Sequence, residues 1–196
     1  MATVDGSLYQ ALVARGVSRR SFLKFSTAMA GALMLPASYG TRIAQALSTS
    51  KRLPVIWLEG QDCAGNTEAF LRASHPTVAE IVLDTLSVDY HETIMTAAGR
   101  QAEAARQATM KAFPGGYIAV VEGSIPLADG GIYCTVGGQA FAETVKEVCS
   151  GAMATIAVGS CAFDGGLPAA SGGPTGAVGV TSVVPKATVM LSLIHI

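Results

Sequence analysis

The stretch "LPVIWLEGQDCAGNTEAFLR", residues 53–72, decides the fold. It begins with a short apolar run, 53–60, which predicts a buried strand. A polar loop with Cys63 follows, and residues 66–76 then have a helical pattern that Pro76 ends. A strand, a loop and a helix in this order are typical of a parallel α/β sheet.

The same pattern recurs further along the chain. Apolar runs at 117–126 and 154–166 predict two more buried strands, each of which is followed by a loop that contains glycine. Helical spacing and one brief strand occupy the other segments, with helices expected at 77–86, 91–113 and 137–152 and the strand at 87–92. Alternating strands and helices predict an α/β domain with helices on both faces of a parallel sheet.

Loops at the carboxyl ends of the strands are the expected place for a site, because these ends share one edge of a parallel sheet. Three such loops are "EGQDCAGN" (59–66), "EGSIP" (122–126) and "GSCAFDGG" (159–166). Two of them carry a cysteine, Cys63 and Cys161. We therefore expect these two thiols to converge although they are far apart in the sequence.

Composition indicates a folded domain with a short appendage. Half of the 196 residues are apolar and only 14% are charged, which is enough to bury a core and argues against disorder. The net charge of −1 divides into +4 for residues 1–46 (five Lys/Arg, one acid) and −5 for the remainder (eight Lys/Arg, thirteen acids). The acidic remainder gives no reason to expect a nucleic-acid partner.

The basic head has the layout of an export signal. "SRRSFLK", residues 18–24, precedes an apolar stretch rich in Ala and Gly, and "AQA", 44–46, is a cleavage pattern. The pair Arg19 and Arg20 marks the twin-arginine type, with cleavage after Ala46. The apolar stretch is short and Gly-rich for a membrane span, and the alternative is a plain amphipathic helix. We expect residues 1–46 to be a signal outside the fold.

This signal class also carries chemical information. Twin-arginine signals serve proteins exported after folding, often with a cofactor already inserted. The head therefore predicts a cofactor and a mature chain that works in the periplasm or at the outer face of the cytoplasmic membrane.

Four cysteines are candidates for cofactor binding or disulfides. Cys63 and Cys161 follow strands and have glycine neighbours that let the backbone approach a bulky group, as an iron–sulfur cluster held by thiolates requires. The alternative is two unrelated buried thiols. Cys149 lies in a predicted helix and is expected to pack as a small apolar residue, while Cys134 lies in a loop where it packs or reaches a site. Disulfides are less favoured, because the chain can build its own core.

Several motifs in order carry a family resemblance. With the signal, they are "WLEGQDCAGNTEAFLR" (57–72), "VVEGSIPLADGGIYCTVGG" (120–138), "AVGSCAFDGG" (157–166) and "GPTGAVGV" (173–180). They resemble the small, electron-transferring subunit of nickel–iron hydrogenases, whose domain is shared with the 20-kDa cluster-bearing subunit of respiratory complex I. The resemblance implies an incomplete flavodoxin-like doubly wound domain at 47–189. Residues 190–196 are expected to be a non-native tail or, alternatively, a last strand.

The resemblance also implies a ligand set. Cys63 and Cys161 fall on two thiolate ligands of the proximal [4Fe–4S] cluster, and a further thiolate would come from a later "GCP" loop that this chain lacks. Asn66 stands where the family has its second cysteine. It could ligate through its carbonyl oxygen, leave an iron open, or cap the helix, and Cys134 is the alternative donor. Asp62 and Glu122 match family acids and are candidates for a proton path, or for loop and helix-capping hydrogen bonds.

The implied function is electron transfer from H2. The nickel–iron centre belongs to a large-subunit partner, further clusters lie in a C-terminal region that this chain lacks, and a membrane cytochrome or other redox acceptor follows. With two of the usual four thiolates, the isolated fragment is expected to be inactive.

Three other functions are alternatives to this one. A flavin- or nucleotide-binding module would need a phosphate-binding glycine motif that is missing. A cysteine-nucleophile enzyme would need a histidine paired with Cys63, and both His75 and His91 read as structural. A non-redox relic scaffold is the third.

Overall fold

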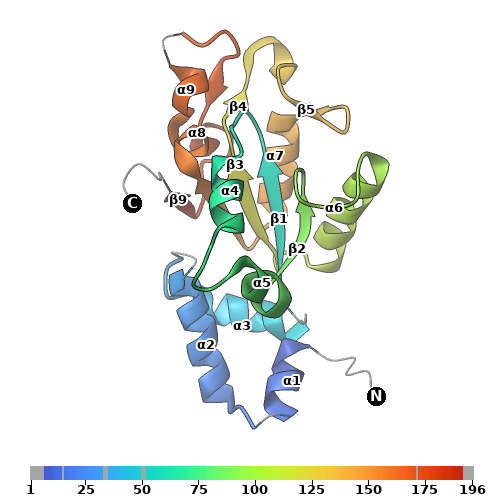
Figure 1. Cartoon of the computed structure of the whole chain (residues 1–196), viewed down its shortest axis with the longest axis vertical. Coiled ribbons are helices and arrows are strands. Elements are labelled where there is room, and N and C mark those ends of the chain that lie inside the picture. Colours follow the sequence, from blue (N-terminus) through green and yellow to red (C-terminus); the bar gives the residue numbers. More distant parts are fainter. Residues whose placement is uncertain (1–6, 15, 33–34, 50–51, 171, 192–196) are drawn as a thin grey trace.

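A parallel sheet forms the centre of the computed structural model, which describes residues 7–14, 16–32, 35–49, 52–170 and 172–191. Its strand order is β2-β1-β3-β7-β9, and every neighbouring pair is parallel. The bounds are β1 Leu53–Glu59, β2 Leu86–His91, β3 Ile118–Glu122, β7 Ala154–Val158 and β9 Val189–Leu191. In chain order these strands run 2-1-3-4-5, which is the flavodoxin-like order. The predicted fold class is confirmed (Figure 1).

Both faces of the sheet are buried, which explains the continuous apolar runs of its strands. Successive side chains point to opposite faces. Val55 and Ile118 pack into a core on one face, whereas Ile56 and Ala119 pack into a second core on the other.

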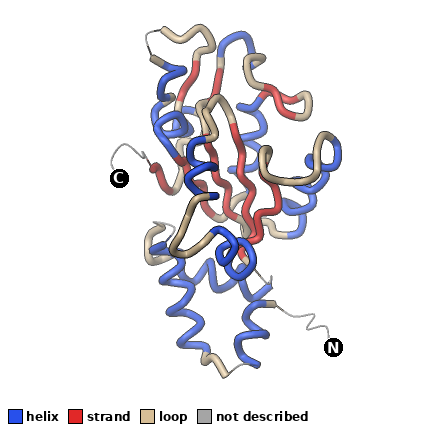
Figure 2. The backbone as a smooth tube through the Cα atoms, in the orientation of Figure 1, coloured by secondary structure: helices blue, strands red, loops and turns tan. Residues whose placement is uncertain are grey.

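Helices cover each face, as predicted (Figure 2). Residues of α6 (Arg100–Ala112) and α7 (Phe141–Gly151) pack into the core that contains Ile56. On the opposite face α4 (Gly65–Leu71) places the Phe70 ring 5.5 Å from that of Trp57. The smaller elements are α5 Val78–Glu80, η1 Ile81–Thr85, β4 Ile125–Pro126, η2 Ala128–Gly131, β5 Thr135–Val136, β6 Gln139–Ala140, α8 Gly159–Asp164, α9 Gly166–Ala169, β8 Ala177–Val178 and η3 Val180–Ser182.

Three predicted helices are shorter than expected. The first ends at Leu71 instead of Pro76. The segment 77–86 begins as predicted, with Thr77 in a capping box with Glu80, but changes after one turn into the π-helical η1 and then into β2. The helix predicted from 91 begins at Arg100, because the preceding residues complete β2 and a turn.

The fourth predicted helix is also shorter, because a hairpin precedes it. The helix predicted over 137–152 begins at Phe141, because Gly137 and Gly138 form the two-residue turn between β5 and β6. Both glycines have positive φ, +61° and +84°, as a type I′ turn requires.

The N-terminal head packs against the sheet. It contains α1 (Leu8–Ala14), α2 (Arg19–Ala32) and α3 (Tyr39–Thr49), which form the end of the molecule at the strand starts (Figure 1). Phe22, Ile43 and Leu47 are buried in one core with Leu53 and Ile118. We expected this segment to lie outside the fold, and in the structure it shares a buried core with residues of β1, β3 and β7. Its assignment as an export signal remains a prediction.

Two further features concern the head and the tail. Among the described residues, no helix combines the length and the apolar character needed to cross a membrane. Strand β9 pairs with β7 through Val189–Leu191, while residues 192–196 lie outside the described part of the chain. The interpretation of 190–196 as a non-native tail therefore remains a prediction.

Candidate functional site

The loops after β1 and β3 run side by side at the carboxyl edge of the sheet. Gly60 N donates to Glu122 O (2.8 Å), and Gln61 and Ser124 exchange two backbone hydrogen bonds of 3.0 Å each. Gly123 has a φ of +89°, and a Cβ there would lie 2.9 Å from the Gly60 backbone, so this close approach requires glycine. The loop that carries Cys63 is thus held at the point where the strand order reverses, the usual place for a ligand.

The third predicted loop meets the first. Asn66 Nδ2 donates to Val158 O (3.5 Å) at the end of β7. Cys161 lies in the short helix α8, not in the glycine-rich loop that we predicted. Burial raises the pKa of the Cys161 thiol, and the nearby Cys63 raises it further. Because β1, β3 and β7 are parallel, both predicted thiols lie at the same edge of the sheet, with Cys63 exposed and Cys161 partly buried.

The other two cysteines take packing positions. Cys149 is buried in the core, and burial raises its pKa to about 11, which is typical of an inert thiol. Cys134 is partly buried at the edge of the same core, and burial raises its pKa as well. All four cysteines lie in the described part of the chain and are free thiols.

A buried carboxylate cluster, formed by Glu59, Thr67, His91 and Glu122, lies behind the first loop. Glu122 accepts hydrogen bonds from Asn66 N (2.9 Å), Asn66 Nδ2 (3.0 Å), Thr67 N (3.2 Å), Thr67 Oγ1 (2.7 Å) and Trp57 Nε1 (3.1 Å). Two of these donors are backbone N–H groups in the first turn of α4, which otherwise lack partners. Of the two roles open for Glu122, hydrogen bonding to a helix end is thus observed, and a proton path stays a prediction.

The other members of the cluster are the Thr67 hydroxyl, the Glu59 carboxyl group and the His91 ring. The Thr67 hydroxyl also lies 3.0 Å from Glu59 Oε1, so its single hydrogen serves one carboxylate at a time. Burial raises the pKa of Glu59, and its Oε2 has no hydrogen-bond partner among the described residues. The His91 ring stacks on the Trp57 ring, with 5.1 Å between the ring centroids. Burial lowers the pKa of His91 to about 4, so His91 is neutral at pH 7.

Glu92 adds a partly buried acid beside this cluster. It accepts hydrogen bonds from Glu59 N and from Tyr90 Oη (3.3 Å), and burial raises its pKa to about 8. Sequence reasoning missed Glu59, Thr67 and Glu92. One signal was present: both buried strands β1 and β3 end in Glu-Gly, at Glu59 and Glu122.

Three acids of the site could suggest a metal ion, since oxygens of Glu59, Asp62 and Glu122 lie within 4.8 Å of one another. However, both Glu122 oxygens already accept hydrogen bonds, and Asp62 Oδ1 accepts one from Ala64 N (2.9 Å). The geometry therefore favours hydrogen-bonded acids over a cation site.

The surroundings of the two thiols fit an iron–sulfur cluster. A Cβ at Gly166 would lie 2.8 Å from Cys161 Sγ, and one at Gly65 would lie 3.2 Å from Cys63 Sγ, so glycine keeps space beside each sulfur. Between these loops, Asn66 Oδ1 is buried without a hydrogen-bond partner among the described residues. Two thiols and one free amide oxygen supply three donors for a group that usually takes four thiolates.

Residues 63–194 match the family of the NADH ubiquinone oxidoreductase 20 Kd subunit. The chain belongs to this family. The match covers more than half of the chain and begins at Cys63, the first residue of the candidate ligand set.

Within this family the chain is similar to hydrogenase small chains. It is 42% identical over 175 residues to the Hydrogenase-2 small chain of Escherichia coli (strain K12), covering 89% of this chain and 47% of that protein. It is 44% identical over 178 residues to the uptake hydrogenase small subunit of Azotobacter vinelandii, covering 91% and 50%. The chain thus spans about half the length of these curated relatives.

A solved structure gives the same result. The fold matches a chain of the reduced, active Ni-Fe-Se hydrogenase from Desulfomicrobium baculatum with a TM-score of 0.69 and 35% identity, over 72% of this chain and 55% of that chain. The resemblance to hydrogenase small subunits that the motifs predicted is confirmed.

Proposed function

We propose that this chain is the proximal-cluster part of the small subunit of an exported nickel–iron hydrogenase. The observation that carries the proposal is the position of both Cys63 and Cys161 at the carboxyl edge of the parallel sheet, after β1 and β7, in a chain similar to hydrogenase small chains. The whole protein would pass electrons from H2 oxidation in a large subunit to further clusters and a membrane acceptor.

In this proposal Cys63 and Cys161 would hold a [4Fe–4S] cluster, and the group would supply single-electron transfer when bound. The chain's own residues fix the ligand loops. Glu122 anchors the start of α4, and the Gly60–Gly123 contact holds the first loop against the second. Because Cys161 is partly buried and Cys63 is exposed, the group would lie at the surface, where a partner could reach it.

The large subunit is the proposed partner, and exposed apolar side chains near the ligand loops support it. They flank the loop after β4 and the helices α8 and α9, at the end of the molecule away from the head (Figure 1). They are Leu127, Ile132, Tyr133, Phe163 and Leu167. A partner subunit could bury such exposed apolar side chains.

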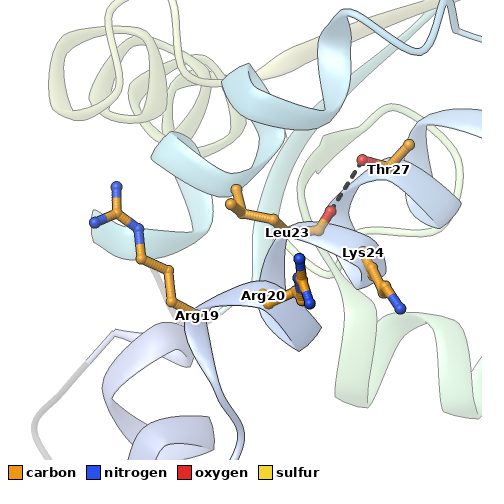
Figure 3. Close-up of a pocket in the computed structure, with 5 residues that line it drawn as sticks. All are labelled: Arg19, Arg20, Leu23, Lys24 and Thr27. Carbon is orange, nitrogen blue, oxygen red and sulfur yellow. Dashed lines mark hydrogen bonds between the residues drawn. The ribbon is translucent and has the colours of Figure 1, made fainter.

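Export by the twin-arginine route is proposed from the head. Arg19 and Arg20 are exposed at the start of α2, beside an open hollow of about 730 Å³ that Lys24 also lines (Figure 3). Their side chains are therefore accessible to a receptor. Arg19→Lys combined with Arg20→Lys should leave the precursor in the cytoplasm, and unchanged export would contradict this route.

The ligand assignment is tested in the whole protein by iron and sulfide analysis. Cys63→Ser and Cys161→Ser should each strongly deplete the proximal cluster. Cys149→Ser, a change in a buried packing cysteine, is the control and should leave iron and sulfide unchanged. A depleted Cys149→Ser variant with an intact Cys161→Ser variant would reject the assignment.

A further inference from the structure

In the hydrogenase small subunits that the chain resembles, a cysteine occupies the position of Asn66. Helix capping is the simplest explanation for an asparagine here, and the contacts of Asn66 exclude it. It does not cap a helix. The N-cap of α4 is Ala64, no side chain caps that position, and Asn66 lies inside the first turn. The N–H groups of this turn go to Glu122 on β3.

The Asn66 amide has one orientation that satisfies its neighbours. Nδ2 donates to Glu122 Oε1 (3.0 Å) and to Val158 O (3.5 Å), and both partners are acceptors. The reverse orientation would place Oδ1 against these same acceptors, because a carbonyl oxygen cannot donate. Glu122 therefore fixes the orientation in which the amide nitrogen is hydrogen-bonded and the amide oxygen remains available to another partner.

That oxygen is a buried polar atom whose hydrogen-bonding capacity is unsatisfied by the described residues. Asn66 Oδ1 is buried and has no hydrogen-bond partner among the described residues. Buried polar atoms are normally paired, and an exception calls for a water or an ion. The amide packs against Gly159 of the Cys161 helix, where a Cβ would lie 2.6 Å from Nδ2 and 2.9 Å from Oδ1.

We propose that Asn66 Oδ1 is the third donor atom toward the cluster, and that Glu122 is the positioning residue that presents it. The inference rests on the proposed function. A neutral carbonyl oxygen is a weaker ligand for iron than a thiolate. One iron of the four would therefore differ in ligation from its neighbours.

The test is Mössbauer spectroscopy of the whole protein, purified anaerobically from cells grown on iron-57. The wild-type protein should show one iron subsite distinct from the thiolate-ligated ones. Asn66→Cys should abolish this subsite. Glu122→Gln should also abolish it, because the glutamine amide can donate to Oδ1 and turn the Asn66 side chain around.

Glu59→Gln is the matched control, since it makes the same change in the same buried cluster but in a residue without a hydrogen bond to Asn66 among those described. It should keep the distinct subsite. In parallel, the side-chain amide signal of Asn66 in nitrogen-15-labelled protein should shift in Glu122→Gln and not in Glu59→Gln. This measurement needs no cluster, and circular dichroism confirms that each variant is folded.

The outcomes separate the two proposals. A wild-type spectrum without the distinct subsite, or a distinct subsite that persists in Asn66→Cys, would overturn the ligand role of Asn66 and leave the proposed function standing. A distinct subsite that survives Glu122→Gln would overturn the positioning role. Purified protein without iron and sulfide would overturn the proposed function and the ligand role together.

Discussion

At the residue scale, two buried threonines differ in what their hydroxyls contact. Thr67 Oγ1 reaches Glu122 (2.7 Å) and Glu59 (3.0 Å), whereas Thr144 Oγ1 is buried without a partner among the described residues. Thr67→Val should lower the free energy of unfolding by about 1–3 kcal/mol, because it leaves buried carboxylates short of a donor. Thr144→Val should be neutral or stabilising. Urea unfolding of both variants tests this, and equal losses would contradict it.

Glu92 is a residue whose burial predicts a pH dependence. Burial raises its pKa to about 8, so the folded chain holds a proton that the unfolded chain releases near its ordinary pKa. The unfolded state binds fewer protons between these values, and stability therefore falls as pH rises, by at most about 1.4 kcal/mol per pH unit. The loss ends once pH exceeds the folded pKa.

The measurement compares urea unfolding of the wild type and Glu92→Gln from pH 6 to 9. The variant should lack this part of the decline and gain relative stability at the alkaline end. Parallel profiles would show that Glu92 is not the group responsible.

Residue-scale predictions from the sequence succeeded where position along a strand was enough. Cys63 and Cys161 were expected to converge because each follows a buried strand, and the structure places both at the carboxyl edge of the sheet. The partners of Glu122 were not predictable, because Trp57 and Thr67 lie far from it in the chain and meet it only through the register of the folded sheet.

At the element scale, the contact between α4 and α8 depends on glycine. Gly159 has a φ of +82°, and a Cβ there would lie 2.6 Å from Asn66 Nδ2. Gly138 has a similar φ of +84° but nothing within 4 Å of its Cβ position. Both Gly→Ala variants incur the left-handed backbone cost of about 1–2 kcal/mol, but only Gly159→Ala adds a clash. Thermal unfolding should show the larger loss for Gly159→Ala, and equal losses would reject this contact.

Element boundaries were less predictable than element types. The apolar runs identified β1, β3 and β7, because strands buried on both faces are apolar throughout. The Ala-rich segment before Phe113 predicted too long a helix. The composition of this segment favours a helix along its whole length. In the structure the residues up to His91 belong to β2, which pairs with β1, and α6 begins at Arg100.

At the scale of the whole molecule, the head and the sheet share a core. Phe22 is 3% exposed in this core, and Phe25, one turn further along α2, is 41% exposed. In the full precursor, Phe22→Ala should lower the free energy of unfolding by about 3 kcal/mol or more. Phe25→Ala should change it by less than about 1 kcal/mol. Similar effects would show that the head is not docked on the sheet in solution.

The fold class could be predicted from the alternation of strands and helices, and the strand order followed from the family resemblance. The docking of the head could not. An apolar run in an export signal and an apolar run in a core helix have the same composition, and only the packing of Phe22 and Ile43 against the sheet distinguishes them.

The proposed cluster site depends most on the closeness of Cys63 and Cys161. A short bifunctional thiol reagent, dibromobimane, applied to the folded chain with Cys134→Ser and Cys149→Ser tests it directly. If the two thiols are close, digestion should release a fluorescent peptide pair that joins Cys63 to Cys161, which mass spectrometry identifies. Peptides modified only singly, from protein shown to be folded, would contradict it.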